Sequence, residues 1–123
     1  MEDIKVGDYI RAKYGIITQI KTIKDTVVWT NEFIDVHHRY NEGIIEKRDI
    51  IKHSPNIIDL IEVGDIIVYK SYSFDDILKE EVWKTKGNNV VYTIDGTEVN
   101  INSIKSIVTK EMFSSVEYRV ENN

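Results

Sequence analysis

The chain has 123 residues, no cysteine and a formal net charge of −5. The lack of cysteine excludes disulfides and thiolate metal sites, and no apolar run approaches the roughly 20 residues that a membrane helix needs. The acidic balance argues against holding duplex nucleic acid by charge alone, because such proteins offer a basic face. The first residues lack the apolar stretch of a signal peptide, so we expect a cytoplasmic protein.

A short motif occurs twice, as Ile-Lys-Val-Gly-Asp-Tyr-Ile at 4–10 and as Ile-Glu-Val-Gly-Asp-Ile-Ile at 61–67. Each copy predicts the entry to a strand. Its glycine permits a positive φ in a tight turn, its aspartate can bond the N–H groups of that turn, and a β-branched run follows. Ser54 and Thr109, 55 positions apart, each precede a short apolar helical turn. We therefore expect two similar units, residues 1–60 and 61–123.

In the first unit, β-branched residues predict five short strands, at 9–13, 16–23, 26–30, 44–46 and 50–53. Residues 31–43 break this pattern and predict a long loop or a splayed hairpin tip. Ser54 and Pro55 predict the start of a helix of one or two turns, since serine suits the N-cap and proline is tolerated at the first helical position.

In the second unit, strands are predicted at 66–72, 90–94 and 97–101. Asp95-Gly96 between the last two predicts a type I′ hairpin turn, with a positive φ at both residues. Residues 73–82 are ambiguous. A capping box and the spacing of the apolar residues favour a short helix there over an extended hairpin.

Four or five short strands and one helical turn per unit describe a small SH3-like barrel. The predicted fold is therefore all-β, with two tandem small SH3-like barrels that each carry a short helical turn. Units of about 60 residues bury little apolar area alone, so we expect them to pack on each other. Self-association through an edge strand is allowed by the same pattern.

Residue patterns for catalysis and metal binding are weak. His37 and His38 near Asp35 form the only imidazole cluster, and a solvated loop tip explains it better than a metal site. The acidic run of the second unit fits the solvated face of a short helix better than a general acid and base: Asp75, Asp76, Glu80 and Glu81. There is no nucleophile elbow, phosphate loop or dinucleotide fingerprint. We expect no enzyme, no cofactor and no metal.

Aromatic and arginine side chains carry the main signal for binding. Small barrels often stack exposed aromatics on a base, a peptide or a methylated side chain, and arginine binds phosphate or carboxylate. Packing of the aromatics within the barrels is the favoured interpretation, with a ligand site as the alternative. The candidate ligand-binding residues are Trp29, His38, Arg39, Tyr40, Arg48, Tyr72 and Trp83.

Residues 50–65 and 104–118, with the opening Val6-Gly7-Asp8, resemble runs in small uncharacterised proteins from phages and prophages of AT-rich Gram-positive bacteria. The resemblance implies a phage accessory protein, and many phage proteins of this size counter host defence. It carries over no catalytic motif and no site residue.

The leading hypothesis is a non-catalytic phage protein that counters host immunity, in its concrete form by sequestering a cyclic nucleotide or a signal like cyclic ADP-ribose. One alternative is a protein–protein inhibitor of a host defence nuclease, of the anti-CRISPR type. Residues 61–123 hold seven Lys/Arg and eleven Asp/Glu, a net charge of −4 that suits mimicry of nucleic acid. A nucleic-acid-binding adaptor is the third. The expected partner is a nucleotide-derived small molecule or a host defence protein, not nucleic acid or a membrane, and a homo-oligomer is allowed.

Overall fold

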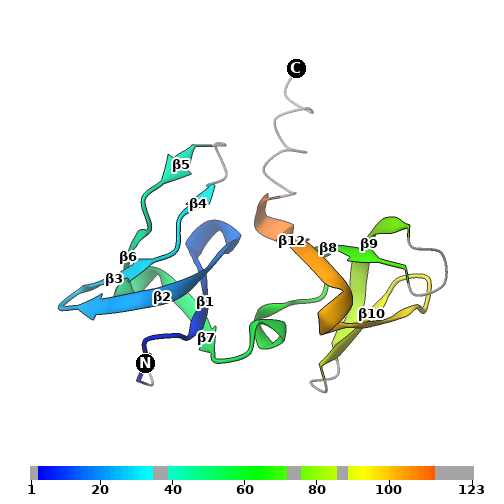
Figure 1. Cartoon of the computed structure of the whole chain (residues 1–123), viewed down its shortest axis with the longest axis horizontal. Coiled ribbons are helices and arrows are strands. Elements are labelled where there is room, and N and C mark those ends of the chain that lie inside the picture. The colour runs from blue at the N-terminus through cyan, green and yellow to red at the C-terminus, as the bar shows by residue number, and fades with distance from the viewer. Residues whose placement is uncertain (1–2, 35–38, 72–75, 86–88, 113–123) are drawn as a thin grey trace. The chain divides into compact units, whose positions relative to one another are not determined.

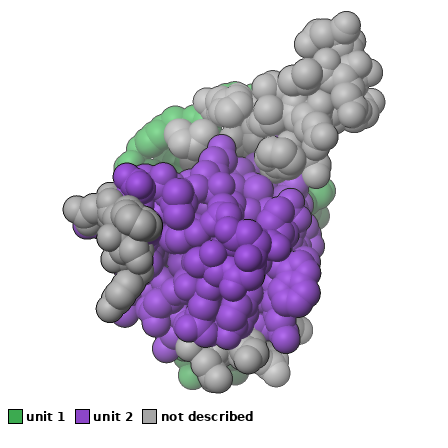
Figure 2. Space-filling view, turned by 90° about the vertical axis from the view of Figure 1, so that its right-hand side faces the viewer, with its two compact units in different colours: residues 1–60, 115–123 green, residues 61–114 purple. Residues whose placement is uncertain are grey.

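The computed structural model describes residues 3–34, 39–71, 76–85 and 89–112, and most of them lie in short β-strands (Figure 1). The chain divides into two compact units between Leu60 and Ile61 (Figure 2). Each unit contains one five-stranded antiparallel sheet, which confirms the predicted all-β class. Within the described ranges, no helix is long and apolar enough to span a membrane.

The sheet of unit 1 has the strand order β6-β3-β2-β1-β7. Its strands are β1 (Tyr9–Ala12), β2 (Ile16–Lys24), β3 (Val27–Thr30), β6 (Ile44–Glu46) and β7 (Ile50–Ser54). A small hairpin of β4 (Phe33–Ile34) and β5 (Tyr40–Asn41) interrupts the connection from β3 to β6. Short 3₁₀ turns lie at η1 (Lys13–Gly15), η2 (Lys47–Asp49) and η3 (Ile57–Leu60). The five predicted strands are confirmed, and residues 31–43 form a hairpin where they are described.

The sheet of unit 2 has the equivalent order β11-β10-β9-β8-β12. Its elements are β8 (Ile66–Lys70), β9 (Ile77–Thr85), β10 (Val90–Thr93), β11 (Glu98–Asn100), the 3₁₀ turn η4 (Ile101–Ser103) and β12 (Ile104–Val108). In both units the last strand returns to pair with the first, directly after a 3₁₀ turn.

The two units match residue by residue through their strand registers. Both contain a β-bulge between the first and last strands, and a second bulge between the second and third. The buried residues Ile10, Ile20, Val28 and Ile45 thereby correspond to the buried Ile67, Val82, Val91 and Val99. Each core is thus built from the same inward-facing positions. By strand register, the position in unit 2 that corresponds to Ser54 is Val108. The repeat in the sequence had matched Ser54 with the next residue, Thr109.

A buried aspartate fixes the turn before the first strand of each unit. Asp8 Oδ2 accepts a hydrogen bond from the Lys5 N–H at 3.1 Å, and the Asp8 N–H donates to the Lys5 carbonyl at 3.0 Å. Asp65 makes the same two bonds with Glu62, at 2.8 and 3.1 Å. The two aspartates are 6% and 0% exposed, and a buried carboxylate needs hydrogen-bond donors such as these.

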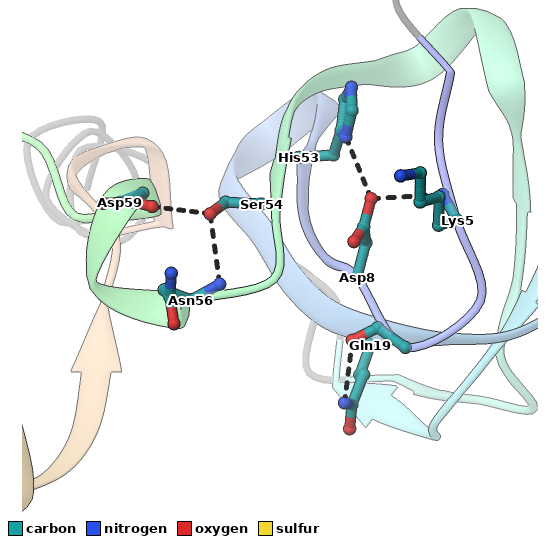
Figure 3. A network of polar contacts seen from close by, with 8 residues as sticks. Lys5, Asp8, Gln19, His53, Ser54, Asn56 and Asp59 are labelled. Carbon is teal, nitrogen blue, oxygen red and sulfur yellow. Dashed lines mark hydrogen bonds and ion pairs between the residues drawn. The ribbon is translucent and has the colours of Figure 1, made fainter.

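Each of these aspartates also bonds a residue at the last strand of its unit or just after it. Asp8 Oδ2 lies 3.0 Å from Nδ1 of His53 on β7, as Figure 3 shows. Asp65 Oδ1 accepts a hydrogen bond from the N–H of Lys110, which follows β12, at 2.9 Å. One carboxylate per unit therefore joins the entry of the first strand to the last strand.

The predicted turn after Ser54 is present as a single 3₁₀ turn. The Ser54 hydroxyl accepts from the Asn56 N–H at 3.1 Å and donates to Asp59 at 2.6 Å (Figure 3). Ile58 and Leu60 of η3 are buried. In unit 2, residues 110–112 form a helical turn at the equivalent place.

The helix predicted at 73–82 is wrong over its described part, because residues 77–85 form strand β9. Leu78 pairs with Tyr69 of β8, and Val82 is fully buried in the core of unit 2. The pairing partner on β8 therefore outweighs the helical spacing of the apolar residues. Residues 73–75 lie outside the described part of the chain.

The type I′ turn predicted at Asp95-Gly96 is also wrong. Only Gly96 has a positive φ, of 89°, and its N–H donates to the Thr93 carbonyl at 2.9 Å. The Asp95 carboxylate accepts hydrogen bonds from the hydroxyl of Thr93 and, at 3.1 Å, from the N–H of Thr97. These bonds stabilise a longer loop in which aspartate keeps a negative φ.

Neither sheet is closed into a barrel, which corrects the predicted closure. Among the described residues, the outer strands β6 and β7 are not hydrogen-bonded to each other, nor are β11 and β12. Each outer strand pairs on one side only, and the strand that precedes the 3₁₀ turn has three residues. So short a strand leaves few backbone groups for a further ladder.

We expect Asp65→Ala to lower the free energy of unfolding by about 2–4 kcal/mol, because two backbone N–H groups lose the buried carboxylate that accepts their hydrogen bonds. Urea denaturation measures this loss. Asp76→Ala is the matched control, since Asp76 is exposed, and it should cost under about 0.5 kcal/mol. Equal effects of the two changes would contradict the structural role of Asp65.

Candidate functional site

A hollow of about 350 Å³ opens beside β1 in unit 1. It begins at the turn η1, passes the hairpin β4–β5 and ends at the turn η2. We call it the unit 1 hollow. It is lined by Ala12, Lys13, Tyr14, Ile16, Phe33, Arg39, Asn41, Ile44, Ile45, Glu46 and Asp49. This volume lies in the range of small-molecule sites in proteins.

Tyr14 presents its ring at this hollow from a strained backbone. It has a φ of +67°, a conformation that is uncommon for any residue other than glycine. The side chain is 58% exposed, and Lys13 Nζ lies 5.2 Å from the ring centroid. Backbone strain of this kind clusters at functional sites in proteins, and an exposed ring can stack on a ligand.

The hairpin β4–β5 supplies the opposite wall. Phe33 packs against the core of unit 1 and lines the hollow, together with Arg39 and Asn41. The hairpin belongs to a 13-residue connection, Asn31 to Gly43, between β3 and β6. In unit 2 the equivalent connection has four residues, Ile94 to Thr97. The fold itself therefore forms without this hairpin.

Charges of both signs surround the hollow. Lys13 and Arg39 bring positive charge, and Glu46 and Asp49 bring negative charge. The Glu46 carboxylate already accepts from Arg48, whose Nε and guanidinium NH2 both lie 2.8 Å from Glu46 Oε2. The lining of the hollow therefore combines two cations with two carboxylates, of which Glu46 is already bonded by Arg48.

Unit 2 contains a hollow at the same place in its fold, of about 830 Å³, and its polar groups bond one another. Burial, and the hydrogen bond that its hydroxyl donates to Glu80, raise the pKa of Tyr69 to about 12. Hydrogen bonds from Thr93 and Thr97 hold the pKa of Asp95 at about 2. The carboxylates that line the unit 2 hollow therefore already accept hydrogen bonds from groups of the same unit.

The structure spreads the predicted site residues over separate places. Arg39 lines the unit 1 hollow. Trp29 on β3 is 43% exposed and lies in another depression, while Arg48 borders a third. Tyr40 on β5 is 60% exposed, and a hydrogen bond with Glu32 raises its pKa.

Trp83 lies in unit 2, on β9, with 59% of its surface exposed and Lys84 Nζ 5.9 Å from its ring. The last two predicted residues, His38 and Tyr72, lie outside the described part of the chain, as do His37 and Asp35.

Sequence reasoning missed Ala12, Lys13, Tyr14, Phe33 and Asn41. Tyr14 was not among the candidate residues, because an aromatic at a strained position has no local signal of its own. A comparison of the two repeats could have found Phe33 and Asn41, because the extra residues between β3 and β6 stand out against the short connection in unit 2.

Among the described residues, no group of three or more His, Asp or Glu side chains is placed to hold a metal ion. Comparison of the chain with protein-family models, with curated proteins and with solved structures gives no match. The case for a function therefore rests on the geometry of the chain itself.

The root of the hairpin depends on Gly43. Its φ is +96°, its carbonyl accepts from the Thr30 N–H at 2.6 Å, and a Cβ there would clash with the Thr30 carbonyl oxygen. Gly7 is a matched control, with a φ of +95° and no atom near its would-be Cβ. We expect Gly7→Ala to cost about 1–2 kcal/mol from the backbone alone, and Gly43→Ala at least about twice as much. Urea denaturation of both variants tests this, and equal costs would contradict the close contact.

The raised pKa of Tyr69 predicts a loss of stability at high pH. An unfolded tyrosine ionises near its ordinary pKa of 10.0, while the folded side chain holds its proton to about 12. The contribution to stability is therefore complete below pH 10 and is lost between pH 10 and 12. Tyr69→Phe should flatten that part of the curve of unfolding free energy against pH. An unchanged slope in this variant would show that other groups control it.

Proposed function

We propose that this chain is a non-catalytic binding protein whose ligand enters the unit 1 hollow. One observation carries the proposal: unit 1 has a hairpin that unit 2 lacks, and this hairpin walls the hollow with Phe33, Arg39 and Asn41. An insertion that the fold does not need is best explained by function, since binding residues concentrate on such connections.

The chemistry of the hollow supports a ligand with both a flat apolar part and an acidic part. Tyr14 offers an exposed ring, and Ile16 and Ile44 offer aliphatic surface. Lys13 and Arg39 are cations that bind phosphate or carboxylate. A nucleotide-derived ligand combines these two parts, so we propose a cyclic nucleotide or a molecule like cyclic ADP-ribose.

The proposed setting is a bacterial cell infected by a phage, where binding of such a signal counters host immunity. It rests on the resemblance of residues 50–65 and 104–118 to small phage proteins. We also propose that each unit is an SH3-like variant. The support is the return of the last strand to the first after a 3₁₀ turn, in both units.

Isothermal titration calorimetry with cyclic dinucleotides, cyclic ADP-ribose and AMP tests the proposal. We expect saturable binding to the unaltered chain, and Tyr14→Ala and Arg39→Ala should each weaken it by about 1–3 kcal/mol. Lys105→Ala, at an exposed lysine of unit 2, is the control and should leave the affinity unchanged. No binding of any of these nucleotides well above the micromolar range would count against the proposal.

A second candidate function is inhibition of a host defence protein. Unit 2 exposes Ile77, Trp83 and Ile94, which are 59%, 59% and 62% accessible, within a half of the chain that is acidic. Exposed apolar side chains on an acidic body suit a protein partner. Copurification of a host nuclease with the tagged chain, lost on Trp83→Ala and kept on Tyr14→Ala, would favour this function over the first.

A further inference from the structure

One position lines the hollow in both units but carries a charge only in unit 1. Asp49 is the last residue of η2 and directly precedes β7, and Ser103 is the last residue of η4 and directly precedes β12. Since β7 and β12 hold the same place in the two sheets, Asp49 and Ser103 are equivalent. Both are partly buried, and each lines the hollow of its own unit. The fold therefore brings this side chain to the hollow without requiring it to be charged.

The carboxylate of Asp49 is available to a ligand. Within the described ranges, the structure gives it no hydrogen-bond donor and no cation as a partner. The other carboxylate of the hollow differs, because Glu46 already accepts from Arg48 at 2.8 Å. A carboxylate only accepts hydrogen bonds, so a free one at a hollow favours a ligand that donates them.

A second position of the unit 1 hollow differs from unit 2 in a similar way. Ala12 and Tyr69 hold the same register position, and Tyr14 and Ser71 each lie two residues beyond them. Tyr14 and Ser71 also line the hollows of their units. Unit 1 therefore has an exposed ring and a free carboxylate at two positions where unit 2 has serines.

A ring and a carboxylate together suit a flat ligand that donates hydrogen bonds from one edge. The ring of Tyr14 can stack on any nucleobase. The two oxygens of the Asp49 carboxylate can accept two parallel N–H groups, as they do from arginine. Among the nucleobases, guanine presents two such donors side by side, N1–H and the 2-amino group, whereas adenine and cytosine place an acceptor beside their amino group.

We infer that the unit 1 hollow selects guanine nucleotides, and that Asp49 is the residue that determines this specificity. The base stacks on Tyr14, and its N1–H and 2-amino groups donate to the Asp49 carboxylate. Lys13, whose Nζ lies beside the Tyr14 ring, contacts the phosphate. This inference rests on the proposed function and deepens it, because it names the base and the residue that recognises it.

Four mononucleotides that differ only in the base test this edge: GMP, IMP, AMP and XMP. IMP lacks the 2-amino group of guanine, and XMP has a carbonyl in its place. In NMR titrations up to about 10 mM, a range suited to fragments, GMP should shift the amide signals of Tyr14 and Asp49. It should bind at least about tenfold more tightly than IMP or AMP. This comparison uses the unaltered chain and needs no variant.

Asp49→Asn exchanges one acceptor for a donor without changing the size of the side chain. We expect this variant to bind GMP at least about tenfold more weakly and to prefer XMP, whose 2-carbonyl accepts a hydrogen bond from the new amide. A structural role of Asp49 alone would not produce this reversal.

Asp49→Ser places in unit 1 the side chain that unit 2 has at this position, in case the first variant does not fold. It should abolish the preference for GMP over IMP. Asp76→Asn, at an exposed carboxylate of unit 2, is the matched control and should leave all four affinities unchanged. A melting curve for each variant confirms that it is folded.

Equal binding of GMP, IMP and AMP by the unaltered chain would overturn the inference. So would a preference for GMP over IMP that survives in Asp49→Ser, or a folded Asp49→Asn variant that does not prefer XMP over GMP. If nucleotides bind in a way that needs Tyr14 but not Asp49, the proposed function stands and only the role of Asp49 fails. If no nucleotide binds, both fail.

Discussion

A buried carboxylate at the start of the first strand is the interaction on which each unit depends. Asp8 and Asp65 satisfy the N–H groups of their own turn and bond a residue at or just after the last strand. This contact adds a side-chain link between the first strand and the last, which also pair directly. It also explains why the Val-Gly-Asp motif is the part of the sequence that the two units share most clearly, since glycine allows the turn and aspartate bonds it.

The two units share this arrangement of strands but differ in the groups that line their hollows. Unit 2 buries Tyr69 on its inner face, and the carboxylates of its hollow are bonded by hydroxyls of the same unit. Unit 1 has Ala12 at the same position and a hairpin inserted above it. Unit 2 lines its hollow with carboxylates that accept hydrogen bonds from its own hydroxyls, and unit 1 lines its hollow with an aromatic ring and with charges of both signs. Duplication provides the comparison that related proteins would otherwise give.

The sequence predicted the parts of the fold that local chemistry decides. The strands of unit 1 follow from β-branched runs, and the turn at η3 follows from Ser54 and Pro55. The errors arose where a distant partner decides: β9 is a strand because β8 pairs with it, and Asp95 keeps a negative φ because Thr93 and Thr97 bond its carboxylate. The candidate site was predicted least well. Its residues come from η1, the hairpin and η2, and only the strand registers bring these segments together.

The pairing of the first strand with the last has a consequence for synthesis on the ribosome. While the nascent unit 1 is short, β1 can pair only with β2, and its other edge waits for β7. The guanidinium of Arg11 on β1 donates to the carbonyl of Leu60, at 2.9 Å, so this contact becomes available only as the last residue of the unit emerges. Such late, long-range contacts slow folding and leave a strand edge exposed until then. Unit 1 nevertheless has every strand it needs before unit 2 begins, so the two similar sequences fold one after the other, and strand exchange between them is disfavoured.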